Sequence, residues 1–137
     1  MGIKVTGLLH HGVRVGKKPE EVEAVRIFYE DILGLNSDEG RPDIRGVPGF
    51  WMNLDSTARQ QIHLMGAEGP SPFAKSENED PVSPHVALAV ENVREAMRVL
   101  DEKEIPYFTF GNIVGNFQLF VRDPAGNMVE LQEAAEE

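Results

Sequence analysis

Apolar and polar residues alternate in several short stretches of the chain, and this spacing predicts half-buried β-strands. In residues 85–90 the larger aliphatic side chains fall on one face, whereas the opposite face carries His85 and two alanines. Small neighbours leave room around the imidazole ring, so we expect this face to border a cavity. Similar patterns predict strands over residues 8–15, 47–54, 60–65, 107–113, 117–122 and 128–132, and a weaker strand within residues 36–45.

Two other stretches have the spacing of amphipathic helices. The first spans residues 19–33, with Pro19 at its first position and Gly34 at its end, and its apolar face comprises Val22, Val25, Phe28, Tyr29 and Ile32. The second spans residues 93–104 after Asn92 as the N-cap, and its core face comprises Val93, Ala96, Met97 and Leu100.

The predicted elements follow the order strand, helix, strands, and this order occurs twice. We interpret it as an α+β fold of two βαβββ modules, at about residues 5–66 and 83–133, within one domain spanning residues 1–137. Residues 66–83 are rich in Gly, Pro, Ser and acidic residues without periodicity, which predicts a long surface loop or linker. A turn is expected at Gly115-Asn116, and a frayed tail at residues 134–137.

The composition narrows the range of partners. The formal net charge is −10, which argues against nucleic acid and against an anionic membrane surface, because both need clustered Lys and Arg. No apolar run approaches the length of a membrane span. The chain has no Cys, so it has no thiolate metal site, and it suits a reducing cytoplasm. We therefore expect a cytoplasmic protein that acts on a small molecule.

Four polar side chains lie at equivalent positions in the alternating pattern of four predicted strands. His10, His63, His85 and Glu130 each lie on the strand face turned away from the large aliphatic residues. Three imidazoles and a carboxylate are suitable ligands for zinc, nickel, cobalt or ferrous iron. A single histidine on a strand is more often structural than a ligand, and His11, on the opposite face, is interpreted as structural. The coincidence of four such positions is what indicates a metal site.

The chain resembles the vicinal oxygen chelate superfamily, which includes glyoxalase I, methylmalonyl-CoA epimerase, type I extradiol dioxygenases and the bleomycin resistance proteins. The matching segments are LHHGVRV at 9–15, FYEDILGL at 28–35, IHL at 62–64, HVALAV at 85–90 and DPAGNMVEL at 123–131. The resemblance implies a glyoxalase-like curved, open-barrel sheet with outer helices, in which each module cups half of a metal site. It also implies a homodimer.

The resemblance places His10, His85 and Glu130 at family metal-ligand positions. At position 63 glyoxalase I carries a Glu ligand and the epimerase a Gln, whereas this chain has His63, which departs from glyoxalase I. In the extradiol dioxygenases the corresponding strand supplies a histidine acid/base, a role that His63 also fits. Arg14 matches an arginine that contacts the glutathione carboxylate in glyoxalase I, whereas Ala67 replaces the Asn typical of a glutathione site.

Three functions follow from these observations. The first is a metal-dependent lyase or isomerase of the glyoxalase type, in which Glu130 and His63 are catalytic and Glu130 acts as general base. The second is a ferrous extradiol-type dioxygenase, and the third is a non-enzymatic binding protein of the resistance type. Arg14, Trp51 and Phe108 are the candidate substrate-binding residues, although aromatic side chains on strands more often belong to the core.

Overall fold

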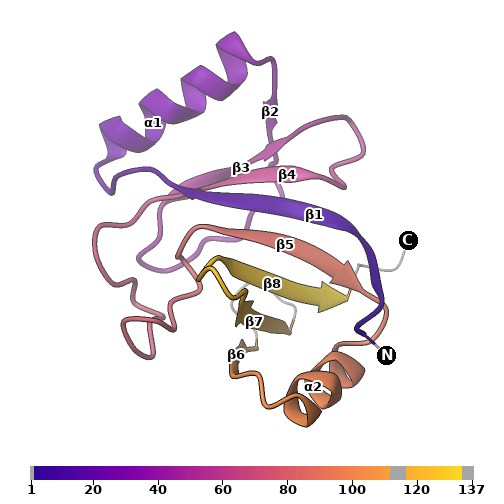
Figure 1. Ribbon diagram of the computed structural model, residues 1–137. Coiled ribbons are helices and arrows are strands. Elements are labelled where there is room, and N and C mark those ends of the chain that lie inside the picture. The colour runs from indigo at the N-terminus through magenta and orange to yellow at the C-terminus, as the bar shows by residue number, and fades with distance from the viewer. Residues whose placement is uncertain (1, 112–116, 134–137) are drawn as a thin grey trace. The chain divides into compact units, whose positions relative to one another are not determined.

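Two successive runs of one strand, one helix and three strands make up the computed structural model, which describes residues 2–111 and 117–133 (Figure 1). The first run contains β1 (Val5–Arg14), α1 (Pro19–Ile27), the π-helical turn η1 (Phe28–Ile32), β2 (Asn36–Ser37), β3 (Gly49–Asn53) and β4 (Gln61–Met65). The second contains β5 (His85–Val90), α2 (Val93–Glu102), β6 (Tyr107–Phe110), β7 (Gln118–Arg122) and β8 (Met128–Glu133). The predicted pair of βαβββ modules is therefore confirmed.

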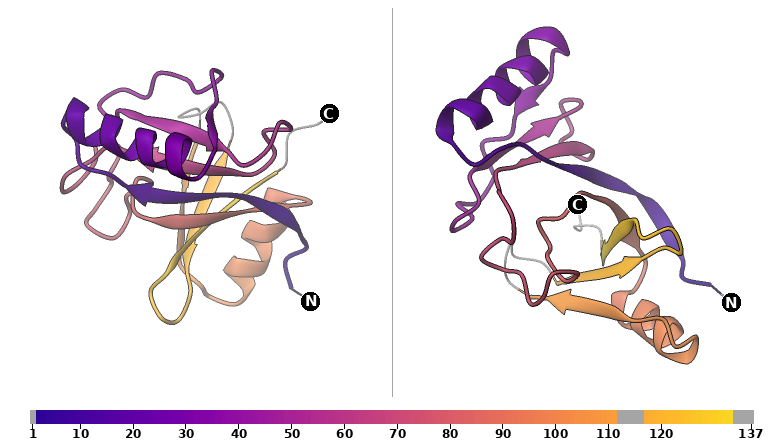
Figure 2. Two further views of the ribbon diagram at one scale, coloured as in Figure 1. Left: turned by 90° about the horizontal axis from the view of Figure 1, so that it is seen from above. Right: turned by 60° about the vertical axis from the view of Figure 1, so that its left-hand side comes forward.

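The strands form a mixed eight-stranded sheet in the order β2-β3-β4-β1-β5-β8-β7-β6. The chain divides into two compact units: the first-module unit is His10–Pro84, and the second-module unit is Met1–Leu9 with His85–Glu137. β1 contributes residues to both. Parallel pairing joins β1 to β4 and β5 to β8, and the remaining pairs within each unit are antiparallel (Figure 2).

The core of the second-module unit forms where α2 packs on the sheet. The side chain of Asn92 caps this helix by accepting a hydrogen bond from the backbone N–H of Glu95 at 3.0 Å, as predicted. The buried cluster comprises Val90, Val93, Ala96, Leu100, Leu119 and Leu131. Because these residues face the helix, the alternate residues of β5, β7 and β8 point to the opposite face of the sheet.

The core of the first-module unit forms between α1 and the sheet, around Val15, Val22, Met52 and Leu64. Helical structure ends before Gly34, which has a φ of 73°. The predicted apolar face is wrong at two positions, since the side chains of Phe28 and Ile32 are 48% and 70% exposed. Both lie in η1, where a π-helical turn advances each residue by a smaller angle than an α-helix does and so rotates them away from the core.

Some predictions concern residues other than those that the structure describes. Residues 112 and 113 of the predicted strand 107–113, the turn at Gly115-Asn116 and the tail at residues 134–137 lie outside the described residues. Among the residues described, no helix combines the length and apolar character needed to cross a membrane.

Gly49 provides a test of strand packing in the first-module unit. A Cβ atom at this position would lie 1.9 Å from the backbone oxygen of Leu64 on the paired strand β4. We expect Gly49→Ala to lower the free energy of unfolding by about 2 kcal/mol, because the strands would have to separate. Gly7→Ala is the matched control, since nothing lies within 4 Å of the added atom. Chemical denaturation that gives both variants equal stability would contradict this packing.

Candidate functional site

A histidine and a carboxylate meet on the inner face of the second-module unit, the face opposite α2. His85 Nε2 lies 3.2 Å from Glu130 Oε1, and the two residues are 5% and 1% exposed. They come together because β5 and β8 are parallel neighbours, with Ala87 paired to Glu130 in the register. The alanines at positions 87 and 89 are buried beside His85 and leave this face to the polar groups.

A second polar contact holds the carboxylate of Glu130. The side-chain amide of Gln132 donates a hydrogen bond from Nε2 to Glu130 Oε2 at 2.5 Å. The two residues share a face because they are two positions apart on β8. A carboxylate buried this deeply requires compensating donors or a cation. The carboxylate oxygens of Glu130 and the ring nitrogen atoms of His85 are suitable ligands for a divalent ion of the zinc or ferrous type.

Aromatic side chains line the same inner face. Phe120 meets the His85 ring edge-on with ring centroids 5.7 Å apart, and Phe108 stacks on Phe120 at 5.0 Å. Phe110 and Met128 complete this cluster. Phe108, predicted to contact substrate, therefore lies one ring away from His85 inside an apolar wall. Its contact with a substrate stays a prediction.

The first-module unit carries a stack of three rings on the strands that contain the other predicted histidines. The His10 and His63 rings lie 3.7 Å apart with planes 15° apart, and Trp51 stacks on the other face of His63 at 4.5 Å. Two imidazoles that bind one ion direct their in-plane lone pairs to a common point. The almost parallel rings of His10 and His63 do not do so in this arrangement, which favours one of the two histidines as a ligand.

Hydrogen bonds define the tautomer of His63. Gln61 directs its amide nitrogen to Asp38 Oδ2 at 2.7 Å and to Asn53 Oδ1 at 2.8 Å. Its amide oxygen therefore points to His63 Nε2, 2.8 Å away, and accepts a hydrogen bond from it. The network assigns a proton to Nε2 of His63 and fixes the orientation of its ring.

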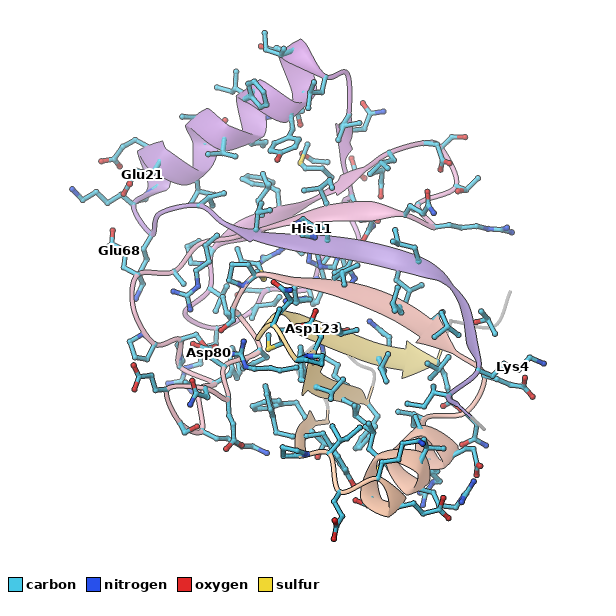
Figure 3. All side chains as sticks on the ribbon, viewed as in Figure 1. Lys4, His11, Glu21, Glu68, Asp80 and Asp123 are labelled. Carbon is cyan, nitrogen blue, oxygen red and sulfur yellow. The ribbon has the colours of Figure 1, made fainter. Side chains whose placement is uncertain are left out.

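The loop after β4 is built around a buried carboxylate, Asp80, which is 3% exposed. Asp80 accepts hydrogen bonds from Ser71 through its backbone N–H and hydroxyl, and from the backbone N–H of Val82. Arg14 on β1 contacts Asp80 at 3.2 Å and donates to the carbonyl oxygens of Val82 and Gly69. The expected surface loop is therefore held against β1 of the first-module unit by the contacts of Asp80, which is labelled in Figure 3.

These contacts change the acidity of Asp80. Burial on its own raises the pKa of the carboxyl group, but the hydrogen bonds from Ser71 and Val82 and the charge of Arg14 outweigh it. The pKa of Asp80 consequently lies below its ordinary range. Arg14 thus has a structural task in this loop, and its predicted contact with substrate stays a prediction.

Within the second-module unit the structure brings Glu130 together with His85, and within the first-module unit it brings His63 together with His10 and Trp51. His11 is exposed on β1 (Figure 3), and its interpretation as structural stays a prediction. Binding of all four candidate ligands to one ion stays a prediction. Gln61 and Gln132 were not predicted from the sequence. Their spacing was nevertheless a signal, because each lies two positions from a predicted residue on the same strand.

Comparison with known proteins gives a consistent result. The model of the Glyoxalase/Bleomycin resistance protein/Dioxygenase superfamily matches residues 7–131. The mitochondrial methylmalonyl-CoA epimerase of Bos taurus is 28% identical over 134 residues, which cover 93% of this chain and 75% of that protein.

Solved structures show the same fold. Methylmalonyl-CoA epimerase from Mycobacterium tuberculosis has a TM-score of 0.69 at 22% identity and covers 99% of this chain and 93% of its own. The E323L mutant of homoprotocatechuate 2,3-dioxygenase from Brevibacterium fuscum has a TM-score of 0.68 at 16% identity, covering 98% of this chain and 34% of its own. The predicted α+β fold class is confirmed.

The Asp80 network predicts how stability depends on pH. Because folding lowers the pKa of Asp80, its contribution is complete above the unfolded pKa of about 4 and is lost as the pH falls through the folded value. We expect Asp80→Asn to lower the free energy of unfolding at pH 7 by about 2 kcal/mol, since hydrogen bonds to a charged group are lost. The variant should also lose less stability than wild type on acidification.

Asp31→Asn is the control, because Asp31 is exposed on η1. Denaturation curves at pH 7 and below pH 4 measure both effects. A variant at Asp80 as stable as the Asp31 control at neutral pH would contradict the anchoring role.

Proposed function

Because the chain belongs to the Glyoxalase/Bleomycin resistance protein/Dioxygenase superfamily, we propose that it is a metal-dependent isomerase. Its substrate is a CoA thioester whose α-carbon loses and regains a proton, as the name of the similar epimerases implies for those proteins. The observation that carries the proposal is the buried pair of His85 and Glu130. This pair supplies metal-ligand chemistry on a face lined by aromatic side chains.

We propose His10, His85 and Glu130 as the ligands of a divalent ion, which is zinc, nickel, cobalt or ferrous iron. When bound, such an ion stabilises negative charge on the oxygen atoms of a substrate. Support comes from the donor chemistry of His85 with Glu130 and from the continuity of β1. His10 follows directly on Leu9, the last residue of β1 that belongs to the same unit as His85 and Glu130.

His63 is proposed to transfer the proton rather than to bind the ion. Its stacking on His10 supports a position outside the coordination of the ion, and the hydrogen bond between Nε2 and Gln61 supports a ring held in one orientation for proton transfer. Inversion at a carbon removes a proton from one face and returns one to the other, and two groups on opposite sides can divide these steps. We propose Glu130 as the second group, so both predicted catalytic residues keep a role.

The residue at position 63 also bears on the choice between the candidate reactions. A glyoxalase I-type site has a carboxylate ligand there by resemblance, and a histidine paired with Gln61 departs from it. A ferrous extradiol-type dioxygenase is the second candidate, because a non-ligand histidine beside two histidines and a carboxylate suits that chemistry. The structural similarity to a dioxygenase supports only the fold.

The remaining proposals concern assembly and location. We propose a homodimer, supported by the exposed apolar side chains of Phe28, Ile32 and Leu33, since exposed apolar surface of this kind favours association. A cytoplasmic location is proposed from the composition, which includes no Cys.

The test is exchange of the α-proton of methylmalonyl-CoA for deuterium in D₂O, followed by NMR. We expect wild-type protein supplied with a divalent ion to catalyse exchange. Glu130→Gln should slow it by about 10²–10⁴-fold, because an amide cannot accept the proton. Glu133→Gln is the matched control on the same strand, where the side chain is exposed.

Two outcomes would contradict the proposed function. One is absence of exchange with any of the four ions. The other is oxygen-dependent ring cleavage of a catechol by the ferrous protein without exchange, which would support the dioxygenase instead.

A further inference from the structure

Gln118, the first residue of β7, is a buried polar side chain that the proposed reaction does not use. The residue is 6% exposed, and its carboxamide oxygen Oε1 is buried with no hydrogen-bond partner among the residues that the structure describes. A buried oxygen without a donor is unfavourable for the folded state. The carboxamide oxygen of Gln118 is therefore a candidate acceptor for a hydrogen-bond donor on a bound ligand.

The strand register places Gln118 on the face that carries the candidate site. Phe120, two residues further along β7, packs against His85 and is paired with Glu130 on β8. One step beyond the pair Leu119 and Leu131, the register brings Gln118 opposite Gln132, whose amide donates to Glu130. Gln118 thus belongs to the same inner face of the second-module unit as the buried carboxylate.

We propose that Gln118 is a substrate-positioning residue that hydrogen-bonds the amide group following the sulfur in a CoA thioester. This inference rests on the proposed function and specifies which part of the substrate is recognised. Gln118 is two residues along β7 from the position that is paired with Glu130, which corresponds to a distance of about 7 Å. The amide nitrogen of a CoA thioester is five bonds from the α-carbon, which is a comparable reach.

The carboxamide of Gln118 and the amide of the ligand are complementary in either orientation of the carboxamide. The Oε1 atom of Gln118 accepts a hydrogen bond from the amide N–H of the ligand. If the carboxamide turns over, its NH₂ donates to the carbonyl oxygen of the same ligand amide. Ligands that lack this amide leave the side chain of Gln118 unpaired, so the residue selects for thioesters of the pantetheine type.

Two synthetic thioesters separate this contact from the rest of the reaction. The methylmalonyl thioester of N-acetylcysteamine contains the amide, whereas the methylmalonyl S-pentyl thioester has the same chain length without it. The measurement is kcat/KM for α-proton exchange with each compound, expressed as the ratio of the two. We expect Gln118→Met to lower this ratio by about tenfold relative to wild type, the size of one hydrogen bond to a buried group.

Gln60→Met is the matched control, because Gln60 is exposed, and it should leave the ratio at the wild-type value. The melting temperature of Gln118→Met should equal or exceed that of wild type, since an unpaired polar atom is removed. An unchanged ratio would overturn the role of Gln118 while leaving the proposed function intact. A sharp fall in melting temperature, shared by Gln118→Leu, would assign the carboxamide to the fold and also overturn it. Failure of wild type to exchange the α-proton of methylmalonyl-CoA itself, measured alongside, would overturn the proposed function instead.

Discussion

A carboxylate buried to 1% exposure, in a chain with a net charge of −10, is the constraint on which the site depends. Glu130 keeps its position because His85 lies 3.2 Å from one oxygen and Gln132 donates to the other. Neither contact supplies a permanent positive charge. The proposed divalent cation would supply one. The neighbouring residues on this face of β5 and β7 are small or aromatic, among them Ala87 and Phe120.

The strand pattern could be predicted from the sequence because alternation has a period of two and one face is buried. For this reason the inward positions of His10, His63, His85 and Glu130 agree with the prediction, and all four are buried. The second helix was predicted equally well, since Asn92 is a strong cap and its apolar residues keep helical spacing.

Three features did not follow from the pattern, each for a physical reason. The π-helical turn at Phe28–Ile32 changes the angle between successive residues, which a fixed period of 3.6 does not anticipate. The loop anchored by Asp80 depends on contacts with Arg14, 66 positions away in the sequence. The pairing of His63 with Gln61 and its stacking on His10 depend on side-chain orientation, which alternation alone does not determine.

We propose that two histidines, His10 and His85, bind the ion with Glu130, while His63 remains outside its coordination. X-ray absorption spectroscopy of protein loaded with one equivalent of zinc counts imidazole ligands from their multiple-scattering features. We expect two imidazoles in wild type and two in His63→Ala, with the metal content of that variant near one ion per chain. Three imidazoles in wild type, falling to two in His63→Ala, would contradict it.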